Sequence, residues 1–272
     1  MNRFDDPKDN RLLAALADAD WQRWRQWLER VDLKQRQVLY EPDRPLRHAY
    51  FPTSAIVSLQ YAMENGASTE FAVVGNEGIV GTSLFLGGAT TTSHGSVLIA
   101  GQGFRIGAQV IRDEFDRSDS VRLLLLRYTQ ALVTQIAQTA VCNRHHTIDQ
   151  QLSGWLLHSL DRLRGSEVVV TQELIARMLG VRRESVTDAA GRLQAAGLIH
   201  YVRGHILVLD RAALEARCCE CHAVVKKEYD RLLPQDAAAR PAAPYRWARP
   251  AWDPVASARG MPQSPDVAKY ES

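Results

Sequence analysis

The sequence predicts an α+β protein made of an N-terminal double-stranded β-roll, a long central helix and a C-terminal winged helix-turn-helix. Three observations predict this order. Short apolar segments alternate with Gly and Pro from Val31 to about Ile111, which is typical of a β-rich domain. A helical period follows from Asp113, and a helix-turn-helix pattern with two short strands after it occupies residues 171–210.

Residues 1–30 are predicted to form a helical segment, because their apolar residues recur at spacings of three and four. Asp20 is placed to cap its second part. Tryptophans at this spacing are much more often packing residues than parts of a cofactor site, so we expect them to cover a core. The apolar residues concerned are Leu12, Leu13, Leu16, Trp21, Trp24, Trp27 and Leu28.

Residues 31–112 are predicted to form the β-roll. Segments rich in β-branched and aromatic residues, such as 55–61, 70–74 and 96–99, have the length of strands. Prolines break the early strands and glycines mark the later turns. Many short strands of this kind favour an all-β sandwich or roll.

A long central helix is predicted over residues 113–147. Its apolar residues cover more than one face, so the helix needs two neighbours, its own domain and a second surface. A second copy of the same helix would supply that surface and make the protein a homodimer. The alternative is a helix buried within one chain. The predicted dimerisation seam consists of Val121, Leu125, Tyr128, Leu132 and Ile136.

Residues 148–233 are predicted to be a DNA-binding domain that opens with a helix over 148–163. Further on, Thr171 can cap a short helix that Gly180 ends with a positive φ angle, and a second helix begins after Arg182. The second helix has a polar, basic start and one apolar side, which is typical of a recognition helix for the DNA major groove. That apolar side consists of Val186, Ala189, Ala190, Leu193 and Ala196.

The outward residues of this motif have the chemistry to contact DNA. Arg183 can donate twice to guanine, and Glu184 can accept from cytosine. Thr171, Gln172 and Arg182 lie at helix N-termini, where phosphate is the expected contact. The full predicted DNA-binding set is Thr171, Gln172, Arg182, Arg183, Glu184, Ser185, Thr187, Asp188 and Arg203.

Two short strands are predicted from Gly197 to Asp210 around a turn at Arg203-Gly204, which would form a wing with Arg203 near the DNA backbone. Asp188 fits this interpretation least, because a carboxylate facing DNA lowers affinity unless it reads a base or pairs with Arg192. The alternative is an ordinary helical hairpin in a globular core. The glycine turn, basic helix start and wing, occurring in this order, favour DNA binding.

Charge and composition agree with this organisation. Residues 1–121 carry 13 Lys and Arg against 16 Asp and Glu, whereas residues 122–211 carry 11 against 7, which suits a polyanion-binding module. Residues 234–272 hold seven of the eleven prolines without periodicity, so we expect a disordered tail. No apolar run approaches a membrane span and the N-terminus does not resemble a secretory signal, so we expect a cytoplasmic protein without membrane association.

The stretch Thr171–Asp210 resembles the winged helix of the Crp/Fnr regulators, the family of the cyclic-AMP receptor protein. The order of β-roll, central helix and winged helix over about residues 30–233 is similar to that family as well. The resemblance implies a homodimer that reads an inverted-repeat operator on double-stranded DNA and contacts RNA polymerase. It implies that Arg183 and Glu184 read bases. A third, basic reader expected four residues after Glu184 is Asp188 here, so the operator sequence is not predicted.

The β-roll resembles a cyclic-nucleotide-binding fold. Val74–Gly81 is similar to the opening of that fold's phosphate-binding cassette, in which Glu77 would hold a ribose hydroxyl. The cassette's Arg-Ser pair is missing, because no Lys or Arg lies between Gly78 and Phe104. An enclosed phosphate needs a positive partner, so we expect a scaffold or another ligand rather than cyclic AMP in the usual mode. A backbone nest at Gly75–Gly81 could still bind an anion weakly. The candidate effector-pocket residues are Gly75, Glu77, Gly78, Gly81 and Ser93.

Four cysteines are too few and too clustered for a disulfide framework. On a terminal helix predicted over residues 211–233, Cys218 shares a face with Cys221, and Cys219 shares one with His222. A structural zinc site needs four ligands from separated pairs, and no second pair is evident, so buried thiols are favoured over metal or redox sensing. The pair His145-His146 is interpreted as a solvated hinge rather than a metal or pH sensor. We predict no metal and no cofactor.

The motifs of common enzyme classes do not occur in the chain, so we predict that it is not an enzyme. The favoured function is a sequence-specific, dimeric DNA-binding transcription regulator with an unidentified effector. The main alternative is a cyclic-nucleotide-responsive signalling module that acts through protein partners and uses the winged helix for packing. A second alternative, an enzyme built on the β-roll, lacks a metal-ligand cluster or nucleophile–base pair in residues 31–111.

Overall fold

The computed structural model describes residues 6–64, 68–88, 90–163 and 165–233, and the tail predicted for residues 234–272 lies outside them. The N-terminal segment is helical, with elements η1 (Pro7–Asp9), α1 (Arg11–Ala14) and α2 (Asp18–Trp24). The Asn10 side chain caps α1 by accepting hydrogen bonds from two backbone N–H groups. The sequence predicted Asp20 as the N-cap of α2, and this prediction is wrong. Ala17 holds the N-cap position, and Asp20 lies inside the first turn.

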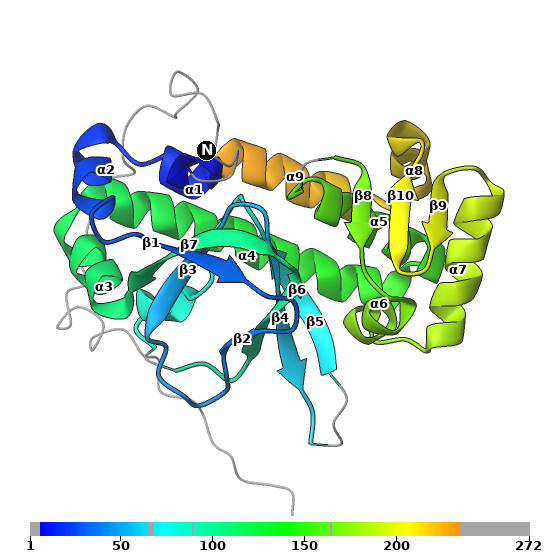
Figure 1. The fold of residues 1–272 in the computed structure, drawn as a ribbon, viewed down its shortest axis with the longest axis horizontal. Coiled ribbons are helices and arrows are strands. Elements are labelled where there is room, and N and C mark those ends of the chain that lie inside the picture. The colour runs from blue at the N-terminus through cyan, green and yellow to red at the C-terminus, as the bar shows by residue number, and fades with distance from the viewer. Residues whose placement is uncertain (1–5, 65–67, 89, 164, 234–272) are drawn as a thin grey trace, which may run out of the picture. The chain divides into compact units, whose positions relative to one another are not determined.

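In the described part of residues 29–107, seven strands form two antiparallel sheets, as predicted (Figure 1). One sheet has the strand order β1-β7-β3 and the other β2-β6-β4-β5. Strands from the start and the end of the domain pair within each sheet, so the domain closes on itself. The elements are β1 (Glu29–Leu33), β2 (Val38–Tyr40), β3 (His48–Pro52), β4 (Ile56–Ala62), β5 (Ser68–Val74), the short helix η2 (Thr82–Leu84), β6 (His94–Ile99) and β7 (Gly101–Gly107).

The sequence predicts one helix from Asp113, whereas the structure has two, α3 (Ala108–Arg117) and α4 (Asp119–His145). The break lies at Ser118, whose backbone is extended. Its side chain accepts a hydrogen bond from the N–H of Val121, which makes Ser118 the N-cap of α4. A capping serine in an otherwise apolar helical pattern is the signal that separates the two helices.

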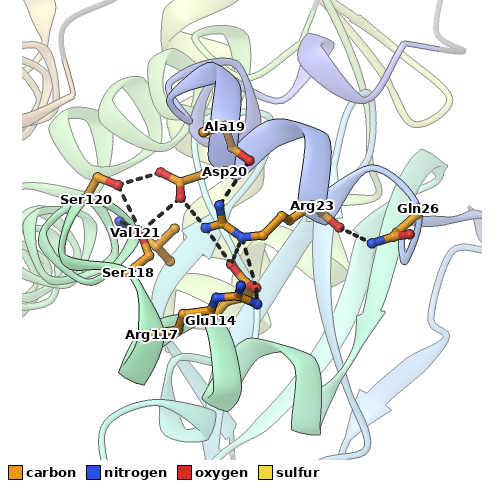
Figure 2. A network of polar contacts seen from close by, with 9 residues as sticks. All are labelled: Ala19, Asp20, Arg23, Gln26, Glu114, Arg117, Ser118, Ser120 and Val121. Atoms are coloured by element: carbon orange, nitrogen blue, oxygen red, sulfur yellow. Dashed lines mark hydrogen bonds and ion pairs between the residues drawn. The ribbon is translucent and has the colours of Figure 1, made fainter.

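Figure 2 shows the polar network that holds α2 to the corner between α3 and α4. The guanidinium of Arg23 donates from Nε to the two carboxylate oxygens of Glu114, at 3.3 and 3.1 Å, and also binds Asp20. Asp20 accepts hydrogen bonds from the Ser118 hydroxyl at 2.9 Å and from the Ser120 hydroxyl. Burial alone raises the pKa of Asp20, but these hydrogen bonds and Arg23 outweigh it, so the pKa lies below its usual value.

The seam predicted for dimerisation faces the core of its own chain. Four of its residues are buried in one cluster with the β-roll and the last helix, and the fifth is half-buried against that cluster. They are Val121, Leu125, Tyr128, Leu132 and Ile136. A second copy cannot reach the four buried side chains, so these four are corrected from dimer contacts to core residues of their own chain. Ile136 is partly exposed, and its contact with a second copy stays a prediction. The helix is apolar on two faces, and the sequence did not show which of them packs on its own domain.

The C-terminal half, residues 148–233, contains three helices and a small sheet of order β8-β10-β9, followed by two further helices. The sequence predicts one terminal helix over 211–233, whereas the structure breaks it at Cys218 and Cys219, which both have extended backbones. The elements are α5 (Ile148–Leu160), β8 (Glu167–Val169), α6 (Gln172–Leu179), α7 (Arg183–Ala195), β9 (Ile199–Val202), β10 (His205–Val208), α8 (Arg211–Arg217) and α9 (Glu220–Leu232).

After this break α9 packs beside α4 (Figure 1). The Tyr229 hydroxyl donates to Gln135 Oε1 at 3.1 Å, and the rings of Tyr229 and Tyr128 lie edge to face. The last helix therefore packs with the N-terminal half, although it follows the winged helix in sequence. Within the described residues, none of the helices is both apolar and long enough for a membrane crossing.

The two larger of three hydrophobic clusters form the cores of the described chain. The first joins the N-terminal helices, the β-roll, α4 and α9 around large buried side chains such as Trp24 and Phe51. The second is the core of the C-terminal half, and it also contains Ile56, Val73 and Leu98 from the four-stranded sheet. The C-terminal half is therefore packed against that sheet.

Gly78 lies in the loop after β5, at a point where the structure leaves no room for a side chain. A Cβ atom at this position would lie 2.2 Å from the ring of Tyr128, which is fully buried in α4. The Gly78 carbonyl also accepts a hydrogen bond from the Asn10 side chain at 2.8 Å. The loop therefore packs against Tyr128 of α4 and is hydrogen-bonded to Asn10 of the N-terminal segment.

We predict that Gly78→Ala lowers the free energy of unfolding by roughly 1–3 kcal/mol, because the added methyl group overpacks a closed core. Urea denaturation followed by circular dichroism measures this change. Gly191→Ala is the control, since a Cβ there meets no described atom within 4 Å. In the middle of α7 this change should stabilise the chain by about 0.5–1 kcal/mol. Equal stability of the wild type and Gly78→Ala would contradict the contact with Tyr128.

Candidate nucleic-acid interface

Helices α6 and α7 form the predicted helix-turn-helix. Thr171 is the N-cap of α6, and its side chain accepts a hydrogen bond from the Leu174 N–H at 3.2 Å. Gly180 ends α6 with a φ angle of 66°, a left-handed conformation that glycine adopts without steric cost. Arg182 then holds the N-cap position of α7. The predicted cap, turn and second helix are confirmed.

Helix α7 has one buried side and one exposed side. The buried residues are Val186, Ala189, Ala190 and Leu193. The residues that face solvent are Arg183, Glu184, Thr187 and Asp188, and Ser185 is half-buried beside them. This is the division that the sequence predicts, except at Ala196, which was expected on the apolar side but is the exposed C-cap of α7. An exposed helix start that carries an arginine and short polar side chains can enter a DNA major groove.

Thr187 links the outward face of α7 to the start of α6. Its Oγ1 atom lies 2.9 Å from Gln172 Oε1 and 3.1 Å from the carbonyl oxygen of Arg183. The hydroxyl can donate to either acceptor. The bond to Gln172 Oε1 holds the Gln172 side chain beside α7. The side-chain amide of Gln172 thus stays near the N-terminus of α6, where a phosphate contact is expected.

Arg192 fixes the far end of α7 to α5. Its guanidinium donates to both carboxylate oxygens of Asp149, with Nη2–Oδ1 at 2.6 Å and Nε–Oδ2 at 3.0 Å. The hydrogen bond from Arg192 holds the pKa of Asp149 below its usual value, with help from Arg217 and against the effect of burial. The pairing of Arg192 with Asp188, which the sequence left open, is not formed. The carboxylate of Asp188 makes no hydrogen bond or ion pair with any residue of the described ranges, although, besides the larger effect of Asp149, its negative charge helps to raise the pKa of Arg192.

Strands β9 and β10 form the wing, with its turn at Arg203-Gly204 as predicted. Both turn residues have positive φ angles, 49° and 88°, which is the combination of a type I′ hairpin turn. Arg203 is exposed at the tip. His205 Nδ1 lies 2.7 Å from Glu167 Oε1, which links β10 to β8. The wing therefore carries a cation at the tip of a short, braced hairpin.

Residues 150–217 match the Crp-like helix-turn-helix domain family. Residues 150–217 therefore form a Crp-like helix-turn-helix domain, and the chain is a DNA-binding transcription regulator. Its fold is similar to a putative transcriptional regulator of the Crp/Fnr family from Eubacterium rectale, with a TM-score of 0.59 and 17% identity over 75% of this chain and 96% of the other. It is also similar to FixK2 from Bradyrhizobium japonicum, with a TM-score of 0.60 and 14% identity over 71% and 98% of the two chains.

A third solved structure with a similar fold is that of CLP, the c-di-GMP-responsive global regulator of Xanthomonas campestris. The TM-score is 0.56, with 18% identity over 71% of this chain and 100% of that one. Among curated proteins, none matches the sequence. These structural similarities, all below one-fifth identity, show the shared fold, whereas the family match lies in the helix-turn-helix itself.

In the β-roll, the residue expected to hold a ribose hydroxyl is already paired within the chain. Glu77 is buried, and its Oε1 accepts a hydrogen bond from Arg162 Nε at 2.8 Å. Its other oxygen accepts one from the Gly75 N–H at 3.1 Å. A Cβ atom on Gly75 would lie 2.7 Å from Arg162 Cβ, and Gly78 makes way for Tyr128 in the same manner. Gly75, Glu77 and Gly78 of the cassette therefore pack against Arg162 of the C-terminal half and Tyr128 of α4.

The other two candidate effector residues have roles within the β-roll. Gly81 has a φ angle of 110° and leads into η2. Ser93 is buried, and its hydroxyl lies 3.0 Å from that of Thr91 and 3.4 Å from that of Tyr40. Among the described residues, Ser93 and Glu77 thus form no hydrogen bond with each other and share no hydrogen-bond partner.

Arg162 is the residue of this region that sequence reasoning missed. Its side chain is 4% exposed, and it also donates to Gln135 Oε1 at 3.1 Å and to the His158 carbonyl at 2.8 Å. The sequence contained a signal for it. Arg162 follows Trp155 and Ser159 at helical spacing, on the same side of the helix as Leu152 and Leu156. A charged residue on a buried stripe indicates a buried partner.

Glu70 on β5 is a second buried carboxyl group at the contact between the two halves. Trp155 Nε1 in α5 donates to Glu70 Oε1 at 3.3 Å. The other carboxyl oxygen has no hydrogen-bond partner among the described residues. Burial raises the pKa of Glu70 to about 7, although hydrogen bonds from Ser58 and Trp155 oppose the shift.

We predict that this carboxyl group makes the stability of the chain depend on pH. A raised pKa favours the protonated form in the folded state, so its stabilising effect is complete below pH 4.5 and is lost as the pH rises through about 7. Glu70→Gln removes the titration. The variant should therefore gain stability relative to the wild type between pH about 5 and about 8, by on the order of 3 kcal/mol.

Urea denaturation of both proteins at the two pH values measures this difference. The control is Glu173→Gln, which changes an exposed carboxyl group on α6. It should shift the stability difference between the two pH values by only a few tenths of a kcal/mol (about 0.5 at most). A gap between Glu70→Gln and the wild type that stays constant with pH would refute the prediction.

Proposed function

We propose that the chain binds double-stranded DNA as a homodimer and reads an inverted-repeat operator with the outward face of α7. The observation that carries this proposal is the exposed position of Arg183 and Glu184 on a helix whose other end is tied to α5 by Arg192. Arg183 donates to O6 and N7 of a guanine, and Glu184 accepts from N4 of a cytosine. A braced helix with unobstructed readers suits base-specific contacts, because their geometry is demanding.

The remaining residues of the interface hold the DNA backbone. Thr171 and Gln172 at the start of α6 and Arg182 at the start of α7 contact phosphate, because helix N-termini attract anions. Arg203 at the wing tip contacts phosphate from the adjacent part of the groove. Ser185, Thr187 and Asp188 complete the set: the two hydroxyls lie beside the readers, and Asp188 limits which base the helix accepts at its position.

The second copy is proposed to pack on the exposed face of α4. Leu126, Val133 and Val141 on this face are 42%, 52% and 45% exposed, which is unusual for three apolar side chains on one helix. Leu126 and Val133 recur with Gln130, Ala137 and Ala140 at alternating spacings of four and three residues, the pattern of a two-helix coiled coil, and Val141 lies beside the end of this series. A parallel pair of α4 helices would give the dimer the two-fold symmetry that an inverted-repeat operator requires.

The effector of the proposed regulator is something other than cyclic AMP bound in the usual mode. A nucleotide at the cassette would have to displace Arg162 from Glu77, and breaking a buried ion pair is costly. We assign the cassette to scaffolding between the two halves. Contact with RNA polymerase and a cytoplasmic location follow from the Crp/Fnr type, and both belong to the proposal.

The alternative function, a signalling module that acts through protein partners, requires the winged helix to serve only for packing. The exposed polar face of α7 disfavours this alternative, because packing would bury it. A gel-shift titration against genomic fragments separates the two. Only the regulator is expected to lose its labelled DNA to unlabelled specific DNA and to show a DNA affinity that falls steeply with salt concentration.

We predict that Arg183→Ala abolishes sequence preference without unfolding the chain. On operator DNA selected with the wild-type protein, affinity should fall by roughly 1–3 kcal/mol, while affinity for random DNA stays nearly constant. Arg182→Ala is the matched control: it should weaken both affinities alike and reduce the slope of log affinity against log salt by about 1. Equal losses on both DNAs for Arg183→Ala would make Arg183 a phosphate anchor instead of a reader.

We also predict that Val133→Glu yields a folded monomer with poor operator affinity, because it places charges at the centre of the proposed α4 contact. Sedimentation velocity measures the oligomeric state, and circular dichroism checks the fold. Val224→Glu, at an exposed valine of α9 off this face, is the control and should remain dimeric. A Val133→Glu dimer as tight as the wild type would place the contact between copies elsewhere.

A further inference from the structure

The end of α4 and the start of α9 bring three cysteines and a histidine together. Cys142 and His146 come from the first segment, and Cys219 and Cys221 come from the second. One sulfur or ring-nitrogen atom from each residue lies within 4.8 Å of the others. The sequence pattern paired these cysteines differently, because it placed residues 211–233 on a single helix. The break before α9 turns Cys219 and Cys221 toward α4 and supplies the second ligand pair that the sequence did not reveal.

The distances within this group fit one tetrahedral metal ion. Cys142 Sγ lies 3.6 Å from Cys219 Sγ, and Cys221 Sγ lies 3.6 Å from His146 Nδ1. With Zn–S near 2.3 Å and Zn–N near 2.0–2.1 Å, a tetrahedron has sulfur–sulfur edges of about 3.8 Å and sulfur–nitrogen edges of about 3.5 Å. An iron–sulfur cluster spreads its ligands over several iron atoms, so a group this compact favours a single ion.

The orientation of His146 also suits a metal ligand. Its Nδ1 atom faces Cys221, while its Nε2 atom lies 3.6 Å from a carboxylate oxygen of Glu220. Histidines that bind metal usually direct their second ring nitrogen to a carboxylate or carbonyl, which fixes the tautomer and the ring plane. Gln151 holds the helix end in place, since its Nε2 donates to the His146 carbonyl at 2.9 Å.

The surroundings of the cysteines are those of an enclosed site. Cys219 and Cys221 are 7% and 5% exposed, and both line a cavity of about 70 Å³ together with Cys142. Cys218 is directed elsewhere: its Sγ lies 3.9 Å from the Gln150 carbonyl and close to Gly154 in α5. Only three of the four cysteines therefore share the group with His146.

A neighbouring group, His158, Asp161 and His222, is less suited to a cation. His222 Nε2 lies 2.8 Å from Asp161 Oδ2, but the same carboxylate also binds Arg211. The positive charge of Arg211 already neutralises the one acidic ligand there. The geometry therefore points to the cysteine group.

We propose that Cys142, His146, Cys219 and Cys221 bind one Zn²⁺ ion. Soft thiolates with one imidazole in tetrahedral geometry are the ligand set that zinc prefers. The thiols lose their protons to solvent as the ion binds. The bound ion joins the end of α4 to the start of α9, at the two places where the chain passes into α5 and out of α8.

Cobalt substitution tests the site in the full-length reduced protein. We expect apoprotein titrated with Co²⁺ under anaerobic conditions to bind one ion per chain. The complex should show the intense visible bands of tetrahedral Co²⁺ and near-ultraviolet bands from thiolate, and one equivalent of Zn²⁺ should abolish both. Weak bands of octahedral Co²⁺, or the absence of binding, would overturn the proposal.

Variants separate the ligands from the remaining cysteine. Cys142→Ser and Cys219→Ser should weaken Zn²⁺ binding by at least 100-fold, measured by competition with a chromogenic chelator, whereas Cys218→Ser should bind like the wild type. Glu220→Gln should weaken it by about 10-fold, because Glu220 only orients His146. Circular dichroism of each variant confirms that it is folded, and the wild-type titration decides the question if one is not.

Three outcomes would count against the zinc site. In the first, Cys142→Ser binds Zn²⁺ as tightly as the wild type. In the second, the purified protein carries iron and inorganic sulfide. In the third, a Cys142–Cys219 disulfide forms in the zinc-loaded protein as fast as in the apoprotein. The last outcome would identify the pair as a redox couple, since a metal ion bound to both sulfurs would protect them from oxidation.

Discussion

The buried ion pair between Glu77 and Arg162 is the constraint on which the arrangement of the two halves depends. A carboxylate and a guanidinium in a protein interior are tolerated only when their remaining hydrogen-bonding groups are also satisfied. Here Gly75, Gln135 and the His158 carbonyl supply those partners. The pair spans the loop after β5 and the end of α5, so it holds the β-roll and the winged helix in one relative position.

This constraint also explains why the β-roll differs from a nucleotide-binding domain while keeping its outline. The loop that resembles a phosphate-binding cassette keeps its glycines, but they make room for Arg162 and Tyr128 rather than for a ligand. The positive partner that is missing from the cassette sequence comes from the other half of the chain. Its charge is taken up by Glu77, so the site is electrically complete without an added phosphate.

Local signals were enough to predict the helix-turn-helix. Thr171, Gly180 and the polar face after Arg182 act through capping, backbone conformation and helical period, which depend only on neighbouring residues. The sequence could not reveal partners from distant segments, such as Asp149 for Arg192 or Arg162 for Glu77. It also left open which apolar face of α4 is buried, because an amphipathic period does not say what covers each side.

The path of the chain through the segment from α5 to α8, which contains the winged helix, restricts how that segment can move. The chain enters it after His146 at the end of α4 and leaves it at Cys218-Cys219, from where α9 returns to α4 (Figure 1). The winged helix is thus an insertion held at two adjacent points. A domain joined to the rest of the chain by one linker can rotate freely about it. A domain joined by two adjacent linkers can rotate only if both linkers twist, so its rotation is restricted. Adjustment to a bent or mis-spaced DNA site therefore falls mainly to the DNA, whose deformability becomes part of the selectivity.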